Sequence, residues 1–139
     1  FGVFDGHNGY RGSLYARENL LINIKEAMAE EGPITADDVQ RAARDGYLKT
    51  DADFLSLGMK DGACLVTVCV TPTHIVASNA GDSRAIMGTG EGVMELTRDH
   101  KPGREDEQAR IEGLGGFVLE LDVARVMGHL AVSRALGDY

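Results

Sequence analysis

The sequence predicts an α+β domain in which two helices come first and an antiparallel sheet follows. Between residues 10 and 58, apolar side chains recur at helical spacing. From Gly62 onward the pattern changes to short apolar runs separated by Gly, Pro, Asp and Ser, which is typical of strands joined by tight turns. Helices in one part of the chain and antiparallel strands in another indicate a layered α+β fold.

A short strand and an amphipathic helix are expected first. Residues 1–4 form an apolar run, and residues 5–9, Asp-Gly-His-Asn-Gly, predict a sharp turn because Gly and Asn tolerate positive φ. The helix is predicted from apolar residues at spacings of seven, three and four. They are Leu14, Leu21, Ile24 and Met28, with Leu20 and Ala27 widening the stripe. Gly32-Pro33 is expected to end this helix.

A second helix is expected between Thr35 and Gly58. Thr35 is a suitable N-cap, and Asp37 and Asp38 place negative charge at the positive end of the helix dipole. Gly58 favours the left-handed turn that commonly ends a helix. The buried side is predicted to carry Val39, Ala43, Tyr47 and Phe54.

The sheet is predicted to be an antiparallel meander. Residues 63–70 are almost continuously apolar, as expected for a strand covered on both faces. Further short strands are predicted at residues 74–80, 84–87 and 93–96, with tight turns between them. The remaining expected elements are a short helix near residues 108–112 and extended segments near residues 117–121 and 130–132.

Composition and charge argue against several classes of protein. Of the 139 residues, 43% are hydrophobic, which is ordinary for a globular core. No apolar run approaches the roughly 20 residues that cross a bilayer, so we expect no membrane partner. The net charge is -8 and the basic residues are scattered. Because such a surface repels phosphate backbones, we expect no nucleic-acid partner.

The two cysteines are predicted to be free thiols. Cys64 and Cys69 lie five positions apart in one predicted strand, so they face opposite sides and cannot form a disulfide. Free thiols favour a reducing compartment, the cytoplasm or the nucleus. Both ends of the chain predict a fragment of a longer protein, because Phe1 opens a strand already in progress and Asp138-Tyr139 lacks a polar tail.

Three aspartates share a context that suits cation binding. Asp5, Asp82 and Asp138 each lie at the end of an extended segment and next to a glycine, which lets the main chain approach another group closely. Carboxylates and main-chain carbonyls are hard oxygen ligands that suit Mg²⁺ or Mn²⁺ rather than Zn²⁺. The simpler alternative is that these are ordinary turn aspartates.

Four motifs in order strengthen the first interpretation. They are Val-Phe-Asp-Gly-His at residues 3–7, Asn-Ala-Gly-Asp-Ser-Arg-Ala at residues 79–85, Asp-His-Lys-Pro at residues 99–102 and Leu-Ala-Val-Ser-Arg-Ala-Leu-Gly-Asp at residues 130–138. Together they resemble the metal-dependent protein serine/threonine phosphatases of type 2C. The likeness runs almost end to end and includes residues 110–116.

The resemblance implies a fold and a metal site. The family fold is a sandwich of two antiparallel sheets flanked by helices, with the site at one end, and residues 1–139 would be a fragment of a single such catalytic domain. Asp5 would bridge two Mg²⁺ or Mn²⁺ ions, the Gly6 carbonyl would complete one coordination shell, and Asp138 would bind the other ion. Asp82 matches a position that in some members helps to hold a third ion.

The resemblance also implies the reaction and its substrate. Phosphoserine and phosphothreonine on a phosphorylated protein would be hydrolysed by direct attack of metal-activated water, with Asp5 and His7 as catalytic residues. His7 would protonate the departing oxygen, because an alkoxide leaves poorly. Arg84 and Arg134, also inside matched motifs, are expected to form structural pairs with carboxylates. Residues 99–102 are expected to shape a turn, so His100 is not expected to be catalytic.

An alternative remains in a different class. Asn8 and Met127 depart from the family pattern, and Asp61 adds a charge that the pattern does not explain. The family pattern also extends beyond both ends, with a phosphate-binding basic residue and further metal-binding acids. The chain alone is therefore expected to be inactive, and the rival hypothesis is a phosphatase-like interaction module without catalysis. The oligomeric state is left open.

Overall fold

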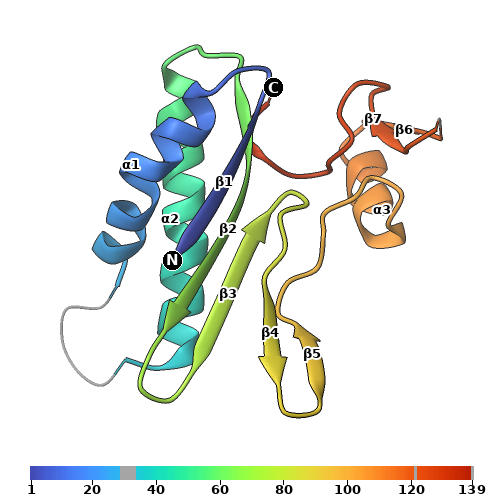
Figure 1. Ribbon diagram of the computed structural model, residues 1–139. Coiled ribbons are helices and arrows are strands. Elements are labelled where there is room, and N and C mark those ends of the chain that lie inside the picture. Colours follow the sequence, from blue (N-terminus) through green and yellow to red (C-terminus); the bar gives the residue numbers. More distant parts are fainter. Residues whose placement is uncertain (29–33, 121, 139) are drawn as a thin grey trace.

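The computed structural model describes residues 1–28, 34–120 and 122–138. Within these ranges the helices are α1 (Arg11–Glu26), α2 (Ala36–Ser56) and α3 (Glu105–Gly113). The strands are β1 (Gly2–His7), β2 (Gly62–Val70), β3 (Ile75–Ala80), β4 (Ile86–Thr89), β5 (Gly92–Glu95), β6 (Val118–Leu119), β7 (Arg125–Val126) and β8 (Leu136–Gly137). All the ladders are antiparallel. The predicted α+β class, with several antiparallel sheets, is confirmed (Figure 1).

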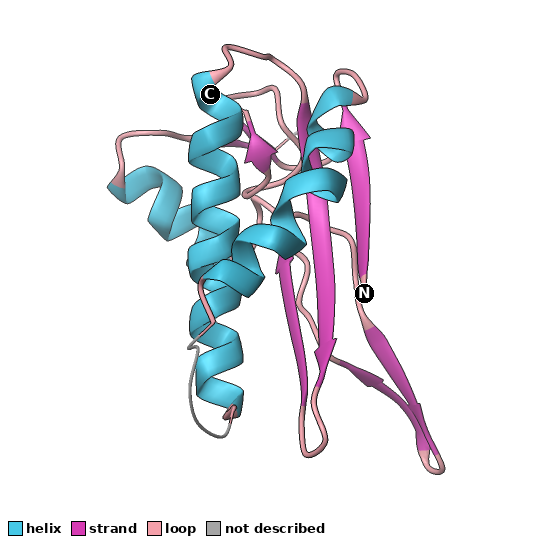
Figure 2. Ribbon diagram, turned by 90° about the vertical axis from the view of Figure 1, so that its left-hand side faces the viewer, coloured by secondary structure: helices cyan, strands magenta, loops and turns pink. Residues whose placement is uncertain are grey.

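The main sheet has the order β1-β2-β3, with β8 paired to the start of β2. Helices α1 and α2 cover one face of this sheet, as Figures 1 and 2 show. The core under the helices contains Leu20, Phe54, Leu65 and Leu136, each at most 1% exposed. Leu136 belongs to β8, so the chain returns to the main sheet after α3, β6 and β7.

The predicted meander is wrong between β3 and β4. Strands β4 and β5 form a separate two-stranded hairpin and do not pair with β3. The main chain leaves the sheet at Gly81, whose φ is +109°. Its carbonyl accepts a hydrogen bond from the His100 amide at 2.9 Å, and its amide donates to His100 Nδ1 at 3.3 Å. The distant residue His100 therefore holds the chain at the point where it leaves β3.

The predicted apolar stripe of α1 is partly wrong. Leu21 is 46% exposed, and the buried residues are Gly12, Ala16, Leu20 and Asn23. Close main-chain contacts set this phase, since a Cβ at Gly12 would lie 3.0 Å from the Gly62 carbonyl. The small residues Gly12 and Ala16 therefore face the sheet, whereas the predicted stripe placed Leu14 there. The predicted stop at Gly32-Pro33 lies outside the described residues.

The predicted boundaries of α2 are confirmed. The Thr35 hydroxyl accepts from the Asp38 amide at 3.2 Å and the Asp38 carboxylate accepts from the Thr35 amide at 3.1 Å, which forms a capping box. Gly58 follows the helix with φ +66°. Val39, Ala43 and Phe54 are buried, as predicted.

The C-terminal elements were anticipated in part. The short helix α3 includes the predicted residues 108–112 and begins earlier, and β6 lies in the predicted extended segment. Strands β7 and β8 were missed, because two residues are too few to produce an alternating pattern. Cys64 is buried, Cys69 is exposed and both are free. Among the described residues, no helix is long and apolar enough to cross a membrane.

Candidate active site

The first strand carries two of the predicted site residues on one face. The turn expected at residues 5–9 begins later, because β1 continues through His7. Alternate residues of a strand point to the same side, so Asp5 and His7 share a face. Phe4, the residue before Asp5, points to the opposite side and packs against the core under the helices. Asp5 and His7 therefore face away from α1 and α2.

An open hollow of about 750 Å³ lies on that face. The predicted residues Asp5, Gly6, His7 and Asp82 all line it. They come from β1 and from the turn after β3, which the register of β1, β2 and β3 brings to one end of the sheet. The lining also includes residues that the sequence did not single out for the site, namely Cys64, Arg125 and His129.

Asp138 reaches this site through His7. Its Oδ2 lies 2.6 Å from His7 Nε2, although 131 positions separate the two residues in the chain. The contact forms because β8 pairs with β2 at Gly62 and Gly137, while His7 pairs with Gly62 from the other side. Figure 1 shows the C-terminal end beside the loop that follows β1.

A glycine at position 62 is required by this arrangement. A Cβ there would lie 2.3 Å from His7 Nε2 and 2.6 Å from Asp138 Oδ2. The two side chains therefore meet directly over the Gly62 main chain. The turn into Asp138 is left-handed, with φ +75° at Gly137 and +51° at Asp138.

Asp82 is paired with a lysine that the sequence interpretation missed. Lys101 Nζ donates to Asp82 Oδ2 at 2.5 Å, and the Cys64 thiol also hydrogen bonds to this carboxylate. Burial alone would raise the pKa of Asp82, but these hydrogen bonds outweigh it and the pKa lies below its ordinary value. Burial raises the pKa of Cys64 to about 11, so it is a protonated donor. The one available signal for Lys101 was its place in the third motif.

The segment that follows His100 forms a turn, as predicted. Pro102 is fully buried, and the Arg104 amide closes a turn on the Lys101 carbonyl at 3.1 Å. His100 ties the turn after β3 to the segment before β8, because its carbonyl accepts from the Ser133 amide at 2.9 Å. Burial lowers the pKa of His100, and the charge of Arg134 adds to this effect.

Both arginines in the matched motifs form carboxylate pairs, as predicted. Arg84 donates to Asp99 from Nε and Nη2, each at 2.9 Å. Arg134 donates to Glu107 from Nε at 3.0 Å and from Nη2 at 2.6 Å. Glu107 is only 2% exposed. Burial alone would raise its pKa, but the arginine hydrogen bonds reverse the effect and lower it far below its ordinary value.

The unexplained Asp61 has a clear local role. Its Oδ2 accepts from the Arg11 amide at 3.0 Å, so it caps the N-terminus of α1, where Tyr10 provides no side-chain cap. A Cβ at Gly9 would lie 2.1 Å from the same oxygen. Asn8 has φ +57°, the left-handed conformation that asparagine tolerates. Asp61 and Asn8 thus shape the turn that follows His7.

The donor chemistry suits a hard divalent cation. Asp5, Asp82 and the Gly6 carbonyl provide oxygen ligands on the hollow, and Asp138 lies beside it. In the part of the chain that the structure describes, no three His, Cys, Asp or Glu side chains are grouped closely enough to hold a metal ion. The metal-ligand assignments therefore stay predictions.

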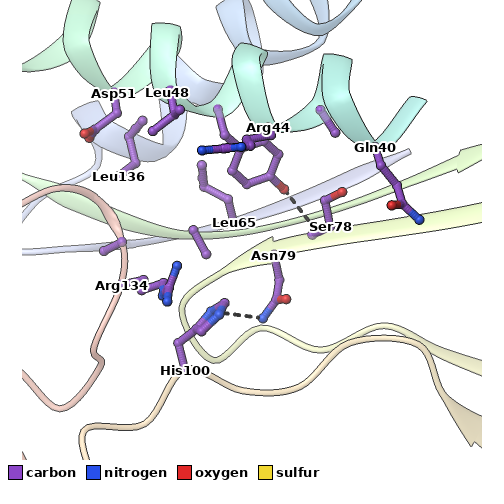
Figure 3. Close-up of a pocket in the computed structure, with 14 residues that line it drawn as sticks. Gln40, Arg44, Leu48, Asp51, Leu65, Ser78, Asn79, His100, Arg134 and Leu136 are labelled. Carbon is purple, nitrogen blue, oxygen red and sulfur yellow. Dashed lines mark hydrogen bonds between the residues drawn. The ribbon is translucent and has the colours of Figure 1, made fainter. Parts of the chain in front are cut away.

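A second hollow of about 590 Å³ lies on the other side of the molecule, between α2, β3 and residues 134–136. Figure 3 shows Arg44 and Gln40 from α2 along it, with Arg134 and His100 opposite and with Asp51 next to Leu136. None of the predicted catalytic or metal-binding residues lines it. Two of its lining residues, Ala80 and Leu136, lie two positions before Asp82 and Asp138 in the chain.

Comparison with known proteins decides the family. The family model described as "Protein phosphatase 2C" matches residues 1–139. The chain belongs to the protein phosphatase 2C family. A similar curated protein is "Probable protein phosphatase 2C 30" of Arabidopsis thaliana, 46% identical over 142 residues that cover 99% of this chain and 36% of that protein.

Solved structures agree with the phosphatase 2C fold. A sex-determining protein of C. elegans matches with a TM-score of 0.82 and 28% identity, over 99% of this chain and 35% of that one. A phosphatase from a pathogenic strain of Toxoplasma gondii matches with a TM-score of 0.77 and 26% identity, over 99% of this chain and 56% of that one. The chain spans about a third of the length of the curated phosphatase 2C relatives it matches first.

Proposed function

We propose that the protein containing this chain hydrolyses phosphoserine and phosphothreonine on proteins, with Mg²⁺ or Mn²⁺ as cofactor. The observation that carries the proposal is the contact between His7 and Asp138 beside a hollow lined by Asp5 and Asp82, in a chain of the phosphatase 2C family. Such convergence is not expected of turn aspartates that only shape local loops.

Each carboxylate has a role in this proposal. Asp5 and the Gly6 carbonyl face the hollow and would hold the ions, and Asp138 would use Oδ1, since His7 occupies Oδ2. Asp82 would contribute to a third ion, in competition with the Lys101 ammonium. Divalent ions bound there would acidify water and neutralise charge on the phosphoryl oxygens.

His7 would act on the leaving group. Asp138 holds the ring through Nε2 at 2.6 Å and so fixes its orientation on the hollow. His7 Nδ1 has no hydrogen-bond partner among the described residues and would carry the proton for the departing serine or threonine oxygen. Arg125, which lines the same hollow, adds a positive charge that a phosphorylated substrate would meet.

The domain assignment belongs to the same proposal. Residues 1–139 would be part of one catalytic domain, because the chain matches about a third of the length of its relatives. The chain by itself is expected to have little or no activity. The rival function is an inactive interaction module, and the experiment below distinguishes it from a phosphatase.

The experiment compares the full-length protein that contains this chain with its Asp5→Asn and His7→Gln variants. With Mn²⁺ and a phosphothreonine peptide, Asp5→Asn is expected to abolish turnover. His7→Gln is expected to slow the peptide reaction much more than hydrolysis of p-nitrophenyl phosphate, whose leaving group needs no proton. Asp53→Asn, a change at a partly exposed position on α2, is the matched control.

Two results would contradict the proposal. If the wild-type protein shows no Mn²⁺-dependent hydrolysis of phosphopeptides, the interaction module becomes the better hypothesis. If Asp5→Asn retains full activity, the site lies elsewhere in the protein.

A further inference from the structure

We propose that Asp51 is a positioning residue for the active site: its carboxylate holds the main chain at Gly137 and so places Asp138 against His7. The inference rests on the proposed function, in which His7 and Asp138 belong to the site. Asp51 lies outside the four motifs and outside the hollow that Asp5 and Asp82 line. It belongs to α2, on the opposite face of the sheet.

The contact itself is direct and long-range. Asp51 Oδ1 accepts a hydrogen bond from the Gly137 amide at 2.8 Å, across 86 positions of sequence. Figure 3 shows Asp51 on its helix next to Leu136, the residue before Gly137. A main-chain amide bonded to a carboxylate forms a charge-assisted hydrogen bond, which is stronger than a bond between neutral groups.

The segment that this bond holds is buried but has few other main-chain partners. Strand β8 consists of Leu136 and Gly137 alone and pairs with β2 at only two positions. Asp138 then adopts φ +51°, a left-handed conformation that aspartate adopts less readily than glycine. Leu136 anchors one end of the segment in the core. The bond to Asp51 is the second anchor, and it acts on the residue directly before Asp138.

The carboxylate of Asp51 lies close enough to that of Asp138 for the two negative charges to interact. Burial raises the pKa of Asp51 and the charge of Asp138 raises it further, while the hydrogen bond from Gly137 opposes both. Two nearby carboxylates repel each other, which destabilises the fold. The hydrogen bond from the Gly137 amide offsets part of this cost and holds the position 51 side chain against that amide.

A set of four variants of the full-length protein tests the proposal. Asp51→Ala removes the acceptor, whereas Asp51→Asn keeps an oxygen that can accept from Gly137. Asp51→Glu keeps the charge but moves the oxygens by one methylene. Asp53→Ala is the control, because Asp53 lies on the same helix, is partly exposed and forms an ion pair only with Lys49 among the described residues.

The kinetic expectation separates positioning from substrate binding. Asp51→Ala and Asp51→Glu are expected to lower kcat by about 10- to 100-fold, as the loss of a group that orients a metal-site residue typically does. KM for a phosphopeptide is expected to stay within about twofold, because Asp51 lines no part of the substrate hollow. Asp51→Asn is expected to restore most of kcat, and Asp53→Ala to leave it unchanged.

A second readout needs neither metal nor activity. Hydrogen exchange of the metal-free protein, followed by mass spectrometry, reports on the peptide that contains residues 134–138. Asp51→Ala is expected to speed exchange in that peptide, while peptides from β2 and β3 stay as in the wild-type protein. Asp51→Asn and Asp53→Ala are expected to match the wild-type protein throughout.

Three outcomes would overturn the proposal. They are an Asp51→Ala protein that matches Asp53→Ala in both readouts, an Asp51→Asn protein as impaired as Asp51→Ala, and faster exchange spread over the whole domain. If Asp51→Ala does not fold, the comparison of Asp51→Asn with Asp51→Glu still decides. If the wild-type protein has no phosphatase activity, the proposed function fails, and the exchange readout alone decides the role of Asp51.

Discussion

The substitution Gly62→Ala is predicted to disable the site while leaving the fold almost intact. The added Cβ would lie 2.3 Å from His7 Nε2 and 2.6 Å from Asp138 Oδ2, whereas real Cβ atoms essentially never approach another atom within 3.0 Å. The nearest clashing atoms are the tips of two side chains. These tips can move apart by several tenths of an ångström without disturbing the strands, so their mutual contact is lost first.

The magnitudes follow from that geometry. Losing a hydrogen bond to a charged group costs about 1.5–3 kcal/mol. If the reaction uses the His7–Asp138 contact, this corresponds to a loss of about tenfold to a hundredfold in kcat. The cost in folding stability is expected to lie at the low end of the same range, about 1.5 kcal/mol, because both side chains are partly exposed.

The assay pairs steady-state kinetics on a phosphopeptide with thermal unfolding of the full-length protein. Gly88→Ala is the matched control, because Gly88 also lies in a strand and a Cβ there meets no atom within 4 Å. Gly62→Ala is expected to lose activity with little change in Tm, and Gly88→Ala to lose neither. An active Gly62→Ala protein would refute the reasoning, as would one that fails to fold.

Three further predictions concern stability and reactivity. Glu107→Gln is expected to destabilise the fold by about 2–3 kcal/mol at pH 7, less than a fully buried pair because Arg134 is half exposed. Since folding lowers the pKa of Glu107, its contribution to folding stability is present above its ordinary pKa of 4.5 and is lost as the pH falls below that value. The urea midpoint of Glu107→Gln is therefore expected to change less between pH 5 and 3 than that of the wild-type protein. Equal changes in the two proteins would contradict this. Iodoacetamide at pH 8 is expected to alkylate the exposed Cys69 well before Cys64, whose buried thiol has its pKa raised to about 11, and equal rates in peptide mapping would exclude that explanation. Tyr47→Phe is expected to cost about 1 kcal/mol of unfolding free energy through its lost hydroxyl contacts, and an unchanged urea midpoint would show that those contacts contribute nothing.

The elements that the sequence predicted well are those held by local interactions. The capping box at Thr35 and the glycine stop at Gly58 act within a few residues, so both ends of α2 could be read directly. The long apolar run of β2 could also be recognised from neighbouring residues alone. By contrast, the buried face of α1 depends on how closely Gly12 approaches Gly62, and no pattern within the helix reports on that distance.

The candidate site divides in a similar way. Asp5, His7, Asp82 and Asp138 could be named from residue type and motif order, although their ligand roles stay predictions. Their partners could not be named, because Lys101, Asp51 and Asp61 act on atoms far away in the chain. A charged residue on a helix or in a turn looks the same in sequence whether it faces solvent or a distant amide.

The sequence by itself determined the family, the order of the principal elements and the residue types available for chemistry, because helix caps, glycine turns and strand patterns are properties of neighbouring residues. Only the tertiary structure decided that His7 meets Asp138, since that contact requires β1, β2 and β8 to converge at a glycine. Convergence of this kind is set by packing between distant segments, and packing depends on shapes and distances that a linear pattern does not record.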